Sequence, residues 1–208
     1  TTEMAGEVGH VVYAARILHH LEDSVEGSAY WAGTLLPDIR HFGIVSRKRT
    51  HPDGVTLSTL EGPDDFITGM RVHAWVDATR EKFLRDQHIK ESLPWHPFVP
   101  HALKLVEDES LYDIYDDWNL IHRILNTIHK QELDYIPNEI QVQRWHSTLQ
   151  DYFKDKPNDE SREKLSLAIG LSEASASEVN SVVAMLKKEK SVHRLIEGCV
   201  QHLEDILR

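Results

Sequence analysis

The sequence lacks a disulfide framework and any long apolar run. Cys199 is the one cysteine among 208 residues, so an internal disulfide is excluded. No stretch of about 18 apolar residues occurs, which a membrane-spanning helix needs, and no basic segment followed by an apolar one opens the chain. These absences predict no stable membrane insertion and a cytoplasmic location, while a cleaved signal peptide stays an open alternative.

Basic residues are outnumbered by acidic ones. The chain has 23 Lys and Arg against 34 Asp and Glu, which gives a formal net charge of −11. The field of such a chain repels DNA and anionic membrane surfaces, so we expect no nucleic-acid partner. A small anionic substrate requires a local basic patch. The composition does not indicate an oligomeric state.

Signals for β-structure are nearly absent, and helical periodicity dominates. Asp53-Gly54 is a candidate hairpin turn, but no alternating strands flank it. Apolar residues recur at helical spacing from about Glu3 to Glu22 and again from Leu111 to Ile128. Gly62-Pro63-Asp64-Asp65 is typical of a helix start, and that helix continues to about His88. The sequence therefore predicts an all-α fold.

The remaining segments suggest two parts of unequal size. Residues 38–62 form a long connection with several glycines and prolines, and connections of that length usually carry function. A polar break at 154–160 precedes three shorter helical patterns that end at Arg208. We predict a helical metal-binding domain over residues 1–157 and a helical appendage over residues 158–208 that packs on the same domain.

His73 and Asp77 are the most informative pair of residues. Their spacing of four places an imidazole and a carboxylate on one helix face, in line with Phe66 and Met70. The chain has three such pairs of histidine and acid, so the spacing alone is not specific. What distinguishes this pair is the apolar stripe, because an inward-facing ionisable pair is costly unless it is hydrogen-bonded or binds an ion.

Other potential ligands lie upstream of this helix. His10 is on the first predicted helix, Asp38 follows Pro37, and His51 precedes Pro52. Imidazoles and carboxylates without thiolates suit Zn, with Mn, Fe or Ni as alternatives. A bridging aspartate, Asp38 or Asp77, would allow two ions about 3.5–4 Å apart. We therefore predict one or two divalent ions held by His10, Asp38, His51, His73 and Asp77.

The same residues resemble a known family. The segments 32–39, Thr50-His51 and 69–77 are similar to those of the zinc-dependent phospholipase C family, which is related to the single-strand-specific zinc nucleases. The resemblance covers about residues 5–80. It implies an all-α multi-helix bundle of that type, with extra C-terminal helices in this chain. It also implies that His10, Asp38, His51, His73 and Asp77 bind metal, in that order along the chain.

The sequence departs from the family at the second group of ligands. Family members have a His-x-x-x-Glu helix shortly after the His-x-x-x-Asp helix, whereas the one such segment here, His193 to Glu197, comes more than a hundred residues later. A mononuclear or dinuclear centre is therefore expected. His96 and His122 are candidate further ligands, and His193 is a more distant one.

The densest basic stretch of the chain lies between two predicted ligands. It runs from Arg40 to Arg49 and ends in Arg47, Lys48 and Arg49, which we assign to binding the substrate phosphate. The pairing of this stretch with a metal predicts hydrolysis of a small phosphorylated substrate, a phosphomonoester or phosphodiester, by water activated at the metal. Asp38 is the predicted catalytic residue, since it could orient or deprotonate that water.

Two alternatives from other classes remain open at this stage. One is a non-catalytic helical binding or scaffold module that retains a partial metal site. The other is a metal-free hydrogen-bond network of His10, His73 and Asp77. Bound metal with an exchangeable position would favour the hydrolase, whereas a closed site would favour the module.

Overall fold

The computed structural model describes residues 4–21, 25 and 27–208, and every regular element in these residues is helical. The predicted all-α class is therefore confirmed. In the same residues, no helix combines the length and the apolar character that crossing a bilayer requires.

The helices that carry the site lie in the first half of the chain, and the remaining ones surround them. In chain order they are α1 (Glu7–Leu18), α2 (Gly27–Leu35), η1 (Pro37–Phe42), α3 (Arg47–Thr50), η2 (Leu57–Thr59), α4 (Asp65–Asp86), α5 (Ile89–Ser92), α6 (Val99–Leu111), η3 (Tyr112–Ile114), α7 (Trp118–Leu125), α8 (Glu132–Tyr135), α9 (Glu139–Phe153), α10 (Asp159–Ala168), α11 (Glu173–Leu186) and α12 (Lys190–Leu207).

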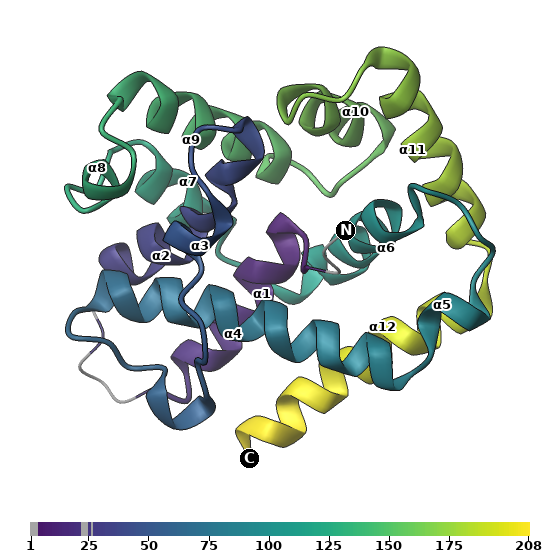
Figure 1. The fold of residues 1–208 in the computed structure, drawn as a ribbon, viewed down its shortest axis with the longest axis horizontal. Coiled ribbons are helices and arrows are strands. Elements are labelled where there is room, and N and C mark those ends of the chain that lie inside the picture. Colours follow the sequence, from purple (N-terminus) through teal and green to yellow (C-terminus); the bar gives the residue numbers. More distant parts are fainter. Residues whose placement is uncertain (1–3, 22–24, 26) are drawn as a thin grey trace.

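Helix α1 lies at the centre of the molecule and contacts α2, α4, α6 and α12 (Figure 1). Helices α7, α8 and α9 gather on one side of it, and α10 and α11 on the other. The C-terminal helices are not detached, because α11 packs on α6 and α12 packs on α4. The boundary at residue 158 stays a prediction.

Helix α4 begins where the sequence predicts it. The Asp64 side chain accepts a hydrogen bond from the Ile67 amide at 2.8 Å, which satisfies one of the free amides of the first turn. The helix ends at Asp86, two residues before the predicted end, and His88 adopts a left-handed conformation with φ of 52°. His73 and Asp77 are both buried on this helix, as the apolar stripe indicates.

Two predicted helices differ from the observed ones. The first is shorter, because Met4 to Gly6 are not helical and Glu7 is the first helical residue; the predicted ends Glu3 and Glu22 lie outside the described residues. The predicted helix from Leu111 to Ile128 is wrong, since Tyr115 is extended and α7 covers only residues 118–125. The apolar spacing continues across this break, so periodicity alone could not detect it.

The physical cause of that break is a local cap. The Asp117 side chain accepts a hydrogen bond from the Leu120 amide at 3.1 Å and starts α7 anew. The indole N–H of Trp118 donates to the Tyr112 carbonyl at 3.2 Å, which folds the chain back on itself.

The long connection at 38–62 is more structured than predicted, because it contains η1, α3 and η2.

Helices α2 and α4 cross closely, with a glycine from each helix at the contact. A Cβ atom on Gly33 would overlap the Phe66 carbonyl, and one on Gly69 would overlap the Tyr30 carbonyl. The hydroxyl of Thr34 lies in the same contact and donates to the Tyr30 carbonyl at 2.9 Å. Because both overlaps involve backbone atoms, the two helices can approach this closely only with glycine at each position.

Helix α1 is capped by a side chain from another helix. Its N-cap residue, Gly6, makes no side-chain hydrogen bond, and the Gly9 amide donates instead to Asp108 of α6 at 2.8 Å. The other oxygen of Asp108 accepts from the Tyr152 hydroxyl at 2.9 Å. Asp108 is fully buried, and burial raises the pKa of its carboxyl to about 7.

This carboxyl makes stability depend on pH. The folded pKa of Asp108, about 7, lies above the ordinary value of 3.8, so the folded chain holds a proton that the unfolded chain releases. Stability should therefore fall as pH rises from 4 to 7, by an amount on the order of 4 kcal/mol at most. The Asp108→Asn variant should lose less stability over the same pH range, because its amide carries no charge.

Urea unfolding of both proteins at several pH values between 4 and 8 measures this difference directly. Other buried groups titrate in both proteins, so the difference between the two curves isolates Asp108. Parallel curves would show that Asp108 keeps its ordinary pKa in the folded chain.

Candidate metal centre

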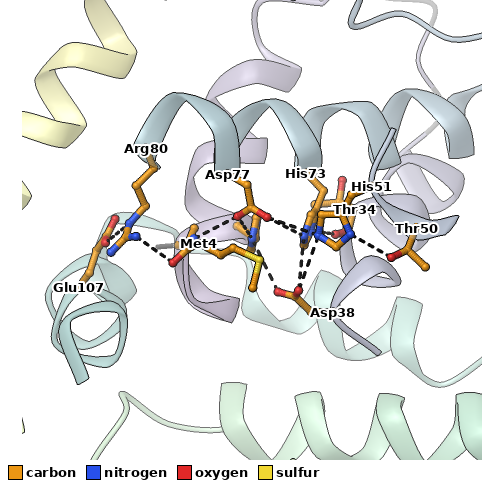
Figure 2. A network of polar contacts seen from close by, with 12 residues as sticks. Met4, Thr34, Asp38, Thr50, His51, His73, Asp77, Arg80 and Glu107 are labelled. Carbon is orange, nitrogen blue, oxygen red and sulfur yellow. Dashed lines mark hydrogen bonds and ion pairs between the residues drawn. The ribbon is translucent and has the colours of Figure 1, made fainter. Parts of the chain in front are cut away.

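Five predicted ligands from four separate segments meet at one buried point. His10 comes from α1, Asp38 from η1, and His51 from the end of α3. His73 and Asp77 lie on α4 and point toward Asp38 and His51 in Figure 2. All five side chains are at most 2% exposed. The fold thus brings together residues that are up to 67 positions apart in the sequence.

The hydrogen bonds behind two of the histidines fix which ring nitrogen faces this point. His73 Nδ1 lies 2.8 Å from the Thr34 carbonyl, which can only accept, so Nδ1 carries the hydrogen. The Thr50 hydroxyl donates to the Arg47 carbonyl at 3.3 Å, which leaves it to accept from His51 Nδ1 at 2.9 Å. In the neutral form of either ring, Nε2 then presents a lone pair to the centre, as in metal-binding histidines.

The facing atoms are close together but make few hydrogen bonds. Within residues 4–21, 25 and 27–208, no hydrogen-bond partner reaches Nε2 of the three histidines, either oxygen of Asp38, or Oδ2 of Asp77. The nitrogen-to-oxygen distances run from 3.1 Å, between His10 and Asp77, to 3.9 Å, between His51 and Asp38. Ligands bound at about 2.1 Å in a tetrahedral site are about 3.4 Å apart, so these spacings match a coordination shell.

Bare lone pairs and carboxylates facing one another in a buried site repel, which a cation would relieve. The rings of His10 and His73 stack with their centroids 3.6 Å apart and an interplanar angle of 8°. Two groups of three could each hold an ion, namely His10 with Asp38 and His73, and His51 with His73 and Asp77. The residues present therefore fit a divalent metal.

The pKa values of the carboxyls favour their charged, metal-binding form. Burial raises the pKa of Asp77, but the facing His10, His51 and His73 outweigh burial and hold it well below its ordinary range. Asp38 behaves in the same way, with His73 as the main opposing group. Burial lowers the pKa of His51, which favours its neutral form.

Guanidinium groups lie beside both carboxylates. Arg40 Nε is 3.6 Å from Asp38, and Arg47 Nη2 is 3.7 Å from Asp77, so neither forms a close ion pair. Arg47 is 40% exposed, which places it between the centre and solvent. Of the three residues assigned to the substrate phosphate, Arg47 alone is seen to contact the centre. Lys48 is exposed, and Arg49 donates to the Asp134 carbonyl at 2.9 Å.

The first described residues cover one side of the centre. The Ala5 amide donates to Asp77 Oδ1 at 3.1 Å, and the Met4 carbonyl accepts from Arg80 at 2.8 Å. Figure 2 shows Met4 between Arg80 and the Asp77 carboxylate. Arg80 is itself held by Glu107 at 2.6 Å, so the segment is anchored to both α4 and α6.

The three further ligand candidates lie elsewhere. His96 pairs with Glu178 of α11 at 3.0 Å, and His193 Nε2 contacts the Lys187 carbonyl at 2.8 Å. Across the described residues, none of His96, His122 and His193 belongs to a group of potential ligands that could hold an ion. The structure therefore does not bring these three histidines to the centre.

Two residues near the centre are not among the predicted ligands. Glu7 and His41 form a third potential group with Asp38, and both are at least partly buried. Glu7 is one turn before His10, and His41 is one turn after Asp38. A spacing of three on a helix places residues on one face, so this signal could have identified them.

Comparison with protein-family models, curated proteins and solved structures finds no match for this chain.

Proposed function

We propose that the chain is a metal-dependent phosphoric ester hydrolase whose centre is formed by His10, Asp38, His51, His73 and Asp77. The observation that carries the proposal is the convergence of these five buried side chains at spacings of 3.1 to 3.9 Å, which hydrogen bonds do not explain. Three imidazoles and two carboxylates suit Zn, with Mn, Fe or Ni as alternatives. When bound, such an ion polarises a phosphoryl oxygen and lowers the pKa of water.

The protein's own residues supply the remaining requirements of the reaction. Asp38 is buried and negatively charged, so it can orient an attacking water and accept its proton. Arg40 lies beside Asp38 and Arg47 lies beside Asp77, both without close ion pairs. Their N–H groups can therefore bind phosphate oxygens and balance the charge that develops on them.

We also propose that the fold is a multi-helix bundle of the zinc-dependent phospholipase C type. The order of the ligands along the sequence resembles that of the zinc-dependent phospholipase C family, and this resemblance supports an assignment to phosphoester chemistry. A soluble phosphomonoester or phosphodiester is the proposed substrate. The net charge of −11 supports the expectation that nucleic acid is not the partner.

Arg47 provides a test of the phosphate assignment. The chain is loaded with Zn or Mn and assayed with p-nitrophenyl phosphate and bis(p-nitrophenyl) phosphate. Loss of one charged contact to phosphate costs about 1.5–3 kcal/mol, so Arg47→Ala should lower kcat/KM by roughly 10- to 100-fold. Arg49→Ala is the matched control, since Arg49 contacts the Asp134 carbonyl, and its kcat/KM should stay near that of the wild type.

Equal losses in the two variants would count against a specific role for Arg47. If the metal-loaded chain hydrolyses neither substrate and no other phosphoester, the hydrolase proposal fails.

The alternative is a non-catalytic helical module with a closed metal site. The observation in its favour is burial, because Asp38 has no exposed area and His10 and His73 are 1% exposed. A closed structural site leaves no position for substrate. To test this alternative, the chain is loaded with Co²⁺ and its absorption spectrum is recorded before and after phosphate is added. An unchanged spectrum would support the module.

A further inference from the structure

The third potential group, Glu7 with Asp38 and His41, lies against the proposed centre and shares Asp38 with it. Each of these residues offers one ligand atom, and the three atoms lie within 4.8 Å of one another. His41 Nε2 is 3.6 Å from Asp38 Oδ1, a spacing of the same size as those among the five ligands.

Two of the three residues in this group, Asp38 and His41, have buried polar atoms that make no hydrogen bond among the described residues. In the described part of the chain, the two carboxylate oxygens of Asp38 have no hydrogen-bond partner, and Nε2 of His41 has none either. Oδ1 of Asp38 faces both groups, since it lies 3.6 Å from His41 Nε2 and 3.7 Å from His73 Nε2. A buried carboxylate without hydrogen bonds is costly, and a second cation would remove that cost.

Helical spacing explains how two positions can lie side by side. On α1, His10 faces the first position while Glu7, three residues earlier, faces the second. On η1, Asp38 lies between the two positions and His41, three residues later, belongs to the second. Two elements therefore supply ligands to both positions through residues one turn apart.

A small cavity lies beside Glu7 and His41. Its volume is about 10 Å³, and its walls include Glu7, His41, His101 and Lys104. A cavity of about 10–15 Å³ holds about one water molecule or ion. Lys104 is buried in the same wall and contributes a positive charge.

We infer that Glu7, Asp38 and His41 hold a second divalent cation, with Asp38 bridging it to the ion of the proposed centre. This inference rests on the proposed function for its first ion. Two carboxylates and one imidazole make the second position harder than the first, so it suits Mn²⁺ better than the histidine-rich position does. A dinuclear centre would stabilise both the attacking and the leaving oxygen of a phosphoester.

The experiment measures the number of ions per chain. Metal-free protein is titrated with Mn²⁺ and followed by elemental analysis and electron paramagnetic resonance. The wild type should bind two ions per chain and give the spectrum of a coupled pair, because a bridging carboxylate holds two ions about 3.5–4 Å apart. Glu7→Gln and His41→Asn should each bind one ion and give an uncoupled spectrum.

His101→Asn is the matched control, since His101 lines the same cavity but does not belong to the group. It should keep two coupled ions. Circular dichroism establishes that each variant is folded, and His41, with 18% of its side chain exposed, is the safer of the two substitutions.

The outcomes separate this inference from the proposed function. One ion in the wild type, unchanged in both variants, would overturn the second position and leave the first intact. Two ions in the wild type and in both variants would also overturn it. Absence of any bound ion in the wild type would remove both the second position and the proposed function.

Discussion

The His73→Ala variant is expected to fold but to lose the ion of the proposed centre and most of the hydrolysis. His73 is the ligand shared by both groups of three that could form the proposed centre. Its ring is 1% exposed and its Nδ1 is committed to the Thr34 carbonyl at 2.8 Å. Alanine offers no ligand in its place, so activity should fall by at least about 100-fold.

Thermal unfolding gives a second measurement that does not depend on activity. A ligand at 100 times its Kd stabilises the folded state by about 2.7 kcal/mol, which for a chain of this size raises Tm by roughly 5–10 °C. Added Zn²⁺ should produce this rise in the wild type and not in His73→Ala. His96→Ala is the control, because His96 pairs with Glu178 away from the centre and should keep both the metal and the rise.

The same comparison tests the metal-free alternative. If His10, His73 and Asp77 formed only a hydrogen-bond network, His73→Ala would lower stability without changing the metal content of the protein. A wild type that contains no metal after reconstitution with Zn, Mn and Fe would establish that network as the better account.

The Gly33→Ala variant is expected to be strongly destabilised. The added methyl group would overlap the Phe66 carbonyl on the facing helix. Helix α2 cannot move away easily, since the Trp145 indole donates to the Leu35 carbonyl at 2.9 Å and holds the end of that helix. Overpacking against backbone should cost about 3 kcal/mol or more, which corresponds to a fall in Tm of roughly 10 °C.

Gly27→Ala is the matched control on the same helix. No atom lies within 4 Å of a Cβ added to Gly27 among the described residues. Alanine is favoured over glycine in a helix, so this variant should be as stable as the wild type or slightly more stable. Urea unfolding of the two variants measures the difference. Similar midpoints would contradict the close crossing of α2 and α4.

The crossing also matters for the metal centre. Asp38 lies three residues beyond the end of α2, and His73 lies on α4 and bonds to Thr34 of α2. Any Gly33→Ala protein that still folds must separate the two helices. Such a protein should bind metal more weakly than the wild type, because its ligands no longer meet at the same point.

Several features of this protein could be read directly from residue spacing. The step of four from His73 to Asp77 places both on one helix face, and the apolar neighbours Phe66 and Met70 show that this face is buried. The cap at Asp64 marks the start of the helix, since its carboxylate suits the free amides there. These signals are local, so they do not depend on how distant segments pack.

Other features depend on contacts between segments and could not be read in this way. The predicted helix over 111–128 is wrong because periodicity does not detect the cap at Asp117. Arg47 and Arg49 are equivalent in the sequence, yet one faces Asp77 and the other bonds to Asp134. The cap of α1 by Asp108 joins residues 99 positions apart.

The sequence by itself determined the helical class, the start of α4 and the order of five ligand-type residues, because each follows from neighbours within one or two turns. The tertiary structure decided that these five meet in one buried place and that Glu7 and His41 lie beside them. It also decided that His96 and His122 stay apart from them. The physical reason is that the glycine-mediated crossing of α2 and α4, and the packing of α1 among its neighbours, set distances that chain-local spacing does not encode.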